Sequence, residues 1–412
     1  MTLSPADIRS ARRRVHIVLI SGQALAGVGM GATLSAGALL VTQVSGSQAL
    51  SGMAATGTTI GAAAAAIPLA ALARRAGRAP SLATGAFIAA AGGGVGLLAA
   101  VLVSFPLLLV GLVMIGVGTA VNLQSRFAAT DLSEPGSRGR DLAVVVWATT
   151  VGAVLGPNLI GPADAFGRSI GLPSLSGPFL FTITAQVLAG TIYFIFLRPD
   201  PLKLAERIGR ERDAAGQTLV DIPKSDPSGV RTGLIALALS HATMVSIMSM
   251  TPVHLVNGGA TLVIVGLTIS LHVAGMYGLS PVFGWLSDRI GREPIIAVGQ
   301  GLLLMALLFV SIGGETQGAV MAGLILLGLG WSASTVAASS LVAESADPLR
   351  RTVIQGRADL LMSASGAAGG ALAGPALALL TYEGLGLIAI ALVVVVLIAV
   401  ALRGAKLRGQ VV

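Results

Sequence analysis

Soft metal donors are concentrated in one short stretch of this chain. The sequence holds 11 methionines and 4 histidines, and seven of these residues lie between His241 and Met276. Met244 and Met248 are four residues apart, as are His272 and Met276, and each pair lies within an apolar run. Thioethers and neutral imidazoles suit a soft ion such as Cu(I). The stretch is therefore the candidate metal-binding region.

The spacing of the first group predicts a shared helix face. His241, Met244 and Met248 stand at positions i, i+3 and i+7, so on a helix they fall within about 60° of one another. Met250 points away from this face and is expected to pack in the core. The donors of this helix would thus line one side of it.

The second group shares a face on the following helix, because His272 and Met276 are at i and i+4. If the two faces meet, they form a series of soft donors through the bilayer centre. We call this predicted set the metal ladder; its members are Met244, Met248, His272 and Met276. The auxiliary candidates are His241 and His254.

Packing is the alternative interpretation of the same residues. Methionine fills irregular gaps in apolar cores, and two methionines four residues apart are common in apolar helices. A buried histidine is harder to explain by packing, since an imidazole without a partner costs a few kcal/mol. His272 has no carboxylate nearby in the sequence, so we expect it to bond a serine or a backbone carbonyl of a neighbouring helix.

The composition indicates which elements position these residues. Of 412 residues, 54% are hydrophobic and only 11% are charged, with 55 glycines, which is typical of a polytopic helical membrane protein. Runs of about twenty apolar residues predict membrane-spanning helices. Twelve such runs occur, at residues 15–41, 45–72, 79–103, 105–125, 142–161, 177–197, 232–256, 260–283, 294–313, 317–342, 354–378 and 384–402.

The distribution of charge predicts the orientation. All of the 26 Lys and Arg residues except Arg168 lie on one side in a twelve-span arrangement. The positive-inside rule then places both termini in the cytoplasm of a multi-pass protein of the bacterial cytoplasmic (inner) membrane. The net charge of +8 is thereby explained by topology, and nucleic-acid binding is not expected. The chain has no cysteine, which excludes disulfides and thiolate metal sites.

The chain divides into two repeated halves. The polar stretch 198–231 separates six apolar runs from six, which predicts bundles at residues 1–197 and 232–412 joined by a cytoplasmic linker. Residues 284–292 read GWLSDRIGR and residues 70–78 read AALARRAGR, so the two loops share leucine, arginine and glycine positions. A second repeat aligns a Gly-xxx-Gly-Pro motif that begins at Gly152 with one that begins at Gly370. Both repeats occur in the same order, which indicates a parallel duplication.

Residues 284–292 resemble the loop signature of the major facilitator superfamily, G-x-L-(A/S)-D-R-x-G-R. The resemblance implies an all-α membrane protein of twelve helices, with two six-helix bundles related by a pseudo-twofold axis. It also implies that Asp288, Arg289 and Arg292 make charged gating contacts that form and break between conformations. In the first-half loop, Arg74 stands where the aspartate is expected. The alternative for Asp288 and Arg289 is a solvated turn between two helices.

The metal ladder resembles the MxxxM and HxxxM signature of CcoA-like (CalT) copper importers of that superfamily. The resemblance implies copper as the transported substrate, with no resident cofactor, and uptake that serves haem–copper oxidase assembly. The expected partners are the copper ion, the lipid bilayer and a cytoplasmic copper chaperone. An organic-solute permease, either a riboflavin-type importer or a drug exporter, is the alternative. No catalytic constellation is present in the sequence, so an enzyme is not expected.

Overall fold

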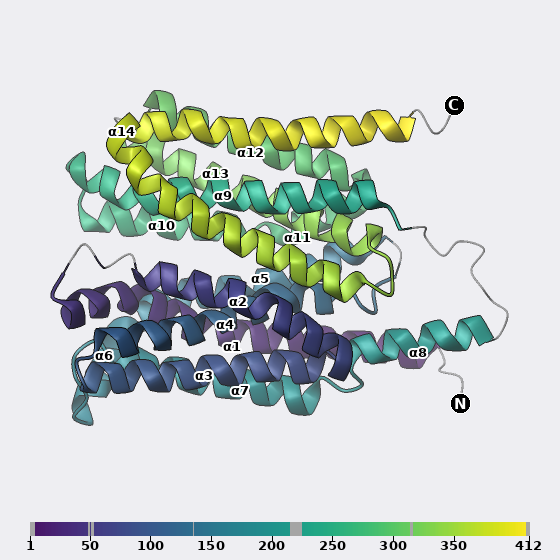
Figure 1. The fold of residues 1–412 in the computed structure, drawn as a ribbon, viewed down its shortest axis with the longest axis horizontal. Helices are drawn as coiled ribbons and strands as arrows, with labels where there is room; N and C mark the ends of the chain where they lie inside the picture. Colours follow the sequence, from purple (N-terminus) through teal and green to yellow (C-terminus); the bar gives the residue numbers. More distant parts are fainter. Residues whose placement is uncertain are drawn as a thin grey trace. The chain divides into compact units, whose positions relative to one another are not determined.

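The computed structural model describes residues 5–47, 50, 53–134, 136–214, 225–313 and 316–408, and no strand occurs within these ranges. Fourteen α-helices lie within these described ranges (Figure 1). They are α1 (Pro5–Ser45), α2 (Met53–Ala76), α3 (Arg78–Val101), α4 (Phe105–Ala128), α5 (Arg138–Asn158), α6 (Ile160–Ser169), α7 (Gly177–Phe196), α8 (Pro201–Ala214), α9 (Pro227–Asn257), α10 (Leu262–Tyr277), α11 (Ser280–Ile290), α12 (Arg292–Gly313), α13 (Gln317–Ser345) and α14 (Arg351–Arg408).

The twelve-helix membrane fold predicted from the sequence is confirmed. Among the described residues, 10 helical segments are long and apolar enough to cross a membrane. Together with α1 and α5 they correspond to the twelve apolar runs of the sequence. Two of the short helices, α6 and α8, lie outside those runs. The second of these, α8, lies within the predicted linker, which the sequence analysis treated as a connection only.

One predicted helix is interrupted. The run 260–283 was expected to form a single helix, but α10 ends at Tyr277 and α11 begins at Ser280. Pro281 stands in the first turn of α11 and has no N–H to continue the helical ladder. The Ser280 hydroxyl donates instead to the Tyr277 carbonyl oxygen at 2.6 Å. The two helices still form one apolar span, Ile264–Ile290.

The last two predicted spans are joined in α14. Thr381 has φ 63° and ψ 178°, which no helix accommodates, and it marks a sharp bend between two straight parts (Figure 1). A β-branched residue at this φ is strained. The spans on either side are Arg351–Leu377 and Leu379–Lys406, so the prediction of two membrane crossings here is confirmed.

The chain folds into two compact units. Unit 1 contains Met1–Glu134, Ala148–Lys224 and Thr352–Leu360, and unit 2 contains Pro135–Trp147, Ser225–Arg351 and Leu361–Val412. The boundary after Lys224 falls within the predicted linker. Two short segments differ from the predicted division, because the first part of α5 belongs to unit 2 and the first part of α14 belongs to unit 1.

Within unit 1, α3 packs against both α4 and α7, and α1 packs against α7 (Figure 1). Leu108 and Leu112 of α4 are buried with Phe179 of α7 in an apolar cluster. Glycines bring helices close together. A Cβ at Gly152 in α5 would overlap the Gly27 backbone in α1, so this glycine allows the two helices to approach closely.

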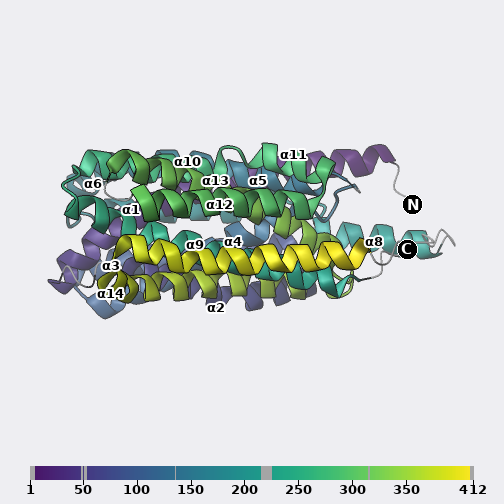
Figure 2. The same cartoon turned by 90° about the horizontal axis from the view of Figure 1, so that it is seen from above.

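Within unit 2, α13 packs against α9, α10 and α12 (Figure 2). The buried amide of Gln300 donates to the hydroxyls of Ser240 and Ser334, both at 2.8 Å. Near the far end of α14, the Arg403 guanidinium pairs with Glu293 at 2.6 Å and with Asp226 at 2.5 Å. These contacts join the ends of α9, α12 and α14.

The repeat in the sequence is also a repeat in conformation. Gly77 lies between α2 and α3 with φ 105° and ψ 173°, and Gly291 lies between α11 and α12 with φ 111° and ψ 163°. A side chain would strain either turn. The arginine that follows each glycine, Arg78 or Arg292, is the first residue of the next helix and is buried.

Candidate functional site

His272 is the most deeply buried member of the predicted metal ladder, with 0% of its surface exposed. Its Nδ1 lies 2.8 Å from the backbone carbonyl oxygen of Leu324 in α13. Because a carbonyl oxygen only accepts, Nδ1 must carry the hydrogen, and in the neutral imidazole Nε2 then has a lone pair. Nε2 is buried and has no hydrogen-bond partner among the described residues. The expectation of a backbone carbonyl partner is confirmed.

Glycines in both helices allow this bond to form. A Cβ at Gly328 in α13 would overlap the carbonyl oxygen of His272. A Cβ at Gly275 in α10 would lie 2.9 Å from the Ile325 carbonyl oxygen. The backbones of α10 and α13 therefore lie close enough for the imidazole to reach a main-chain acceptor.

The methionines of the ladder differ in exposure. Met244 in α9 is 3% exposed and Met276 in the last turn of α10 is 7% exposed. Met248 is half-buried, as is Met250, the residue expected to point away. Both helices pack against α13 and contact each other. The ladder residues therefore lie on neighbouring helices of unit 2.

His241 belongs to an aromatic cluster with Trp331 and Tyr277. The indole Nε1–H of Trp331 donates to His241 Nδ1 at 3.0 Å. The Tyr277 ring stands edge-on to Trp331, with centroids 5.8 Å apart. In this arrangement the lone pair of His241 accepts from the indole, so the ring would have to leave Trp331 to bind a metal through Nδ1.

The other auxiliary histidine, His254, stacks on Tyr382 with ring centroids 4.1 Å apart. The Tyr382 hydroxyl lies 2.7 Å from that of Thr251. No group of three or more His, Asp or Glu side chains in the described ranges is placed to hold a metal ion.

Asp288 holds the beginning of α5 within unit 2. Its carboxylate accepts from the backbone N–H groups of Gly139 and Arg140, at 2.9 and 2.8 Å. These are N–H groups of the first helical turn, which have no partner inside the helix. A negative charge is also stabilised at a helix N-terminus. The expected basic partner is present as well, because Arg292 pairs with Asp288 at 2.6 Å.

Arg292 extends this contact to a third helix. Its guanidinium also pairs with Glu344 of α13 at 2.5 Å and donates to the Ser287 hydroxyl at 3.1 Å. Arg289, the third predicted gating residue, does not take part in these contacts. It is exposed, and its guanidinium lies 4.7 Å from the centroid of the Trp285 ring. Two of the three predicted residues are thus brought together.

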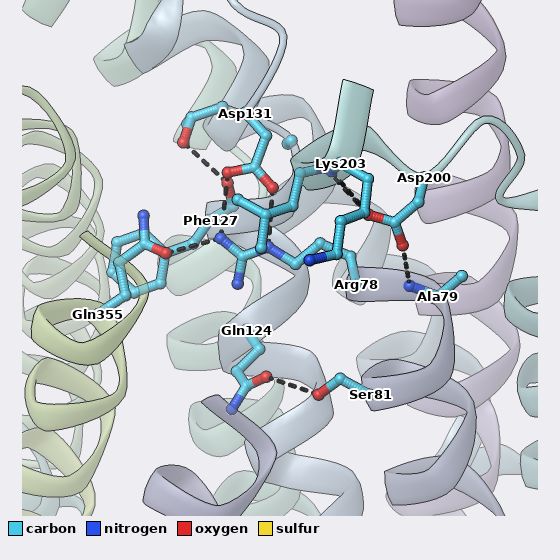
Figure 3. A network of polar contacts seen from close by, with 12 residues as sticks. Arg78, Ala79, Ser81, Gln124, Phe127, Asp131, Asp200, Lys203 and Gln355 are labelled. Carbon is cyan, nitrogen blue, oxygen red and sulfur yellow. Dashed lines mark hydrogen bonds and ion pairs between the residues drawn. The ribbon is translucent and has the colours of Figure 1, made fainter. Parts of the chain in front are cut away.

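Arg78 is the corresponding residue of unit 1 and is 1% exposed (Figure 3). Its Nε and Nη2 donate to the two carboxylate oxygens of Asp131 at 2.8 and 3.1 Å. The same Nη2 donates to the Gln355 side chain at 2.7 Å. This bidentate geometry is the strong form of an Arg–carboxylate contact, and it fixes part of α14 against α3.

Asp200 lies beside this network (Figure 3). It accepts from the Ala79 N–H at 2.8 Å and from the N–H groups of Leu202 and Lys203 at 3.1 and 3.2 Å. One carboxylate thus serves the first turns of α3 and α8. Lys203 in turn donates to the carbonyl oxygen of Arg74 at 3.2 Å. The structured start of α8 is therefore tied to the loop of unit 1.

The sequence analysis missed a buried ion pair in unit 1. Arg126 of α4 pairs with Asp359 of α14 at 2.8 Å, and their side chains are 3% and 0% exposed. The signal was present in the sequence, since Arg126 directly follows one apolar run and Asp359 lies near the beginning of another. Their partnership was not visible, because 233 residues separate them.

Membrane-spanning helices in two units, with charged networks at the helix ends, define a multi-pass membrane transporter. The chain belongs to the Major Facilitator Superfamily, whose sequence pattern matches residues 19–356 and, in a second match, residues 233–408. This is a family of transporters rather than enzymes. The second match covers the C-terminal half, in agreement with a duplicated chain.

Relatives cover most of the chain. It is 38% identical over 389 residues to the uncharacterized MFS-type transporter YdeG of Bacillus subtilis (strain 168), covering 93% of this chain and 90% of YdeG. It is 28% identical over 357 residues to the riboflavin transporter RfnT of Brucella anthropi, covering 86% of this chain and 87% of RfnT. The crystal structure of the human organic anion transporter MFSD10 matches with a TM-score of 0.75 and 18% identity, covering 94% of this chain and 99% of MFSD10. That likeness shows the fold.

Proposed function

We propose that this transporter takes up copper across the bacterial cytoplasmic membrane by alternating access. The proposed path is the metal ladder, and the copper serves haem–copper oxidase assembly. The observation that carries the proposal is the state of His272. A fully buried imidazole presents an unpartnered Nε2 in the same helix as Met276.

The hydrogen bond to Leu324 supports a ligand role for His272. Metal-binding histidines usually donate their other ring N–H to a carbonyl or a carboxylate, which fixes the tautomer and the ring orientation. The bond from Nδ1 to the Leu324 carbonyl oxygen has this form. A histidine kept only for packing would leave an imidazole nitrogen buried without a partner, which is costly.

The thioethers supply the remaining steps of the path. Met244 and Met276 are buried on adjacent helices, so an ion that enters here has left bulk water. A soft thioether binds Cu(I) without a formal charge, which favours transfer between neighbouring sites. Because the chain has no cysteine, we expect a cytoplasmic chaperone to provide the thiolates that receive the ion.

The test is copper accumulation by cells that lack this protein, complemented with the wild type or a variant. His272→Asn keeps a side-chain donor for the Leu324 carbonyl oxygen but removes the Nε2 lone pair. Met244→Leu and Met276→Leu keep volume and apolar character, so the fold should survive. Met250→Leu is the matched control, a half-buried methionine of α9 outside the ladder.

We expect His272→Asn and the two ladder methionine variants to lose most copper uptake, while Met250→Leu transports normally. Each variant is compared at equal membrane abundance. If His272→Asn and both leucine variants accumulate copper like the wild type, the ladder is core packing and not the path. If the wild type itself restores no more copper than the strain that lacks the protein, copper is not the cargo.

A riboflavin-type organic solute is the second candidate. It is supported by the similarity to RfnT and by the aromatic cluster of His241, Tyr277 and Trp331. Planar aromatic ligands stack on such side chains. Uptake of riboflavin by the complemented cells distinguishes the two, and Trp331→Leu should reduce riboflavin uptake but leave copper uptake unchanged.

We also propose that both termini and α8 face the cytoplasm. The absence of cysteine makes single-cysteine labelling direct. Arg210→Cys on exposed α8 should resist a membrane-impermeant thiol reagent added to intact cells. Arg168→Cys on α6 is the positive control, since its side chain is 61% exposed and is expected on the outside. The reverse labelling pattern would overturn this topology.

A further inference from the structure

A groove in unit 1 lies between the beginning of α1 and the end of α7. It has a cavity volume of about 580 Å³. Its walls include Arg13, Arg14, Ile17 and Val18 of α1, with Ile192 and Phe196 of α7. None of these residues belongs to the metal ladder or to the charged networks described above. The groove is therefore a separate feature of the molecule.

The lining of α1 is one continuous helix face. From Ser10 to Ser21 the lining positions recur every three or four residues, so they follow a single stripe. Arg14 Nε donates to the Phe196 carbonyl oxygen at 3.2 Å, so Arg14 of α1 lies beside Phe196 of α7. Ile192 lies one turn before Phe196, alongside the apolar part of the stripe. The groove thus changes along its length from basic to apolar.

Within the part of the chain that the structure describes, the arginines of the basic end have no ion-pair partner. Arg13 and Arg14 are both exposed, and no carboxylate in the described ranges makes an ion pair with either. Their neighbour Arg12 differs, because it pairs with Glu134 at 3.2 Å. Two positive charges beside an apolar groove, at the end of membrane-spanning helices, complement a lipid with an anionic headgroup and an acyl chain.

We propose that this groove is a binding site for an anionic phospholipid. Arg13 and Arg14 hold the phosphate, and one acyl chain lies against Ile17, Val18 and Ile192. The stripe from Arg14 to Ser21 rises by about 10 Å, which is roughly two-thirds of the hydrocarbon depth of one leaflet. The occupant is a lipid of the surrounding bilayer, so the site is independent of which cargo the transporter carries.

Native mass spectrometry of the purified protein tests this proposal. The protein is titrated in detergent with phosphatidylglycerol or with zwitterionic phosphatidylethanolamine, and retained lipids are counted. The test variant is Arg13→Gln/Arg14→Gln. The matched control is Arg74→Gln/Arg75→Gln, which removes the same charge from exposed arginines at the end of α2. Ser21→Phe narrows the apolar end and leaves both arginines in place.

We expect the wild type to retain phosphatidylglycerol in preference to phosphatidylethanolamine. Arg13→Gln/Arg14→Gln should weaken phosphatidylglycerol binding about thirtyfold, which corresponds to about 1 kcal/mol for each arginine near an anionic lipid. The control should bind like the wild type, and Ser21→Phe should also bind more weakly. Equal retention by the Arg13/Arg14 variant, or an equal loss in the Arg74/Arg75 control, would overturn the site. Unchanged lipid binding by Ser21→Phe would show that the acyl chain does not lie in the apolar part of the groove.

Discussion

The loop between α2 and α3 and the loop between α11 and α12 descend from one repeated motif, yet they hold their neighbours by different chemistry. Both turn at a glycine with positive φ. Both continue with a buried arginine that binds a carboxylate, Arg78 with Asp131 and Arg292 with Glu344. The shared part of the motif therefore builds the same corner in each unit.

The two units differ in the contacts that hold the first turn of a neighbouring helix, α5 in unit 2 and α14 in unit 1. In unit 2, Asp288 accepts two backbone N–H groups at the start of α5. In unit 1 the corresponding residue is Arg74, and its side chain is exposed. The start of α14 is held there by side chains instead, through Arg78 to Gln355 and Arg126 to Asp359. Unit 1 therefore lacks the aspartate contact of unit 2 and holds its helix start partly through a buried ion pair.

The two solutions should respond differently to mutation. A helix N-terminus interacts with a carboxylate through several N–H groups and a partial charge. A buried ion pair concentrates the interaction in two groups, and removal of one leaves the other desolvated and uncompensated. Loss of a partner in unit 1 should therefore affect folding, whereas loss of Asp288 should mainly affect transport.

The largest expected effect is that of Arg126→Leu. It leaves the Asp359 carboxylate, which is 0% exposed, without its ion-pair partner, and we expect a loss of about 3–5 kcal/mol of stability. Thermal unfolding of the purified protein in detergent measures it. Arg126→Leu/Asp359→Leu should recover most of the loss, because neither charge of the pair is then left buried without its partner. If Arg126→Leu alone is as stable as the wild type, the ion pair does not stabilise unit 1 and the proposed difference between the units is wrong.

Asp288→Asn should come next. The amide still accepts a hydrogen bond but has no charge for the start of α5 or for Arg292. We expect transport to fall about tenfold, equivalent to about 1.4 kcal/mol, with membrane abundance largely unchanged. Uptake per unit of immunodetected protein is the measurement. Arg289→Gln is the control, since Arg289 lies outside the network; normal transport by Asp288→Asn would reduce the loop to a solvated turn.

Gln355→Ala should have a smaller effect. Arg78 keeps both bonds to Asp131 and loses only its bond to Gln355. A single hydrogen bond to a charged group contributes about 1.5–3 kcal/mol at most, so the midpoint of thermal unfolding should shift less than in Arg126→Leu. If the shift is larger than that of Arg126→Leu, the Arg78–Gln355 hydrogen bond contributes more to stability than the Arg126–Asp359 ion pair, contrary to the expected order.

Arg74→Asp restores the aspartate that the repeat predicts and should change least. The Arg74 side chain is exposed, and only its carbonyl oxygen is used, by Lys203. We expect a change of stability within about 0.5 kcal/mol. A marked gain in stability would show that a helix N-terminus in unit 1 is still placed to bind an aspartate. The two units would then differ only in the loss of this one contact.

Much of the fold could be predicted from the sequence, and the exceptions have local causes. Apolar length identified the spans, because the bilayer imposes one length on every crossing helix. The break between α10 and α11 depends on Pro281 and on the Ser280 hydroxyl bond to Tyr277. A proline within an apolar run is compatible with either a kink or a break, so the run alone predicted a continuous helix.

The candidate site was predictable in its residue types but not in its contacts. The spacing of Met244, Met248, His272 and Met276 indicated soft donors, and their metal role stays a prediction. The Leu324 carbonyl that orients His272 lies in another helix. Main-chain acceptors carry no sequence signal, because every residue has one. The glycines Gly275 and Gly328 were visible, but which helices they bring together was not.

The sequence by itself determined the membrane class, the number of crossings, the internal repeat and the family, because these depend on composition and on short local motifs. The tertiary structure decided the partners. Arg126 with Asp359 and Arg78 with Gln355 are 233 and 277 residues apart, and the same charges could have paired otherwise in another packing of the helices. The hydrophobicity of a segment determines whether that segment crosses the membrane, without reference to the rest of the chain. The partner of a charge and the tautomer of a histidine depend on which side chain or carbonyl the fold brings within about 3 Å.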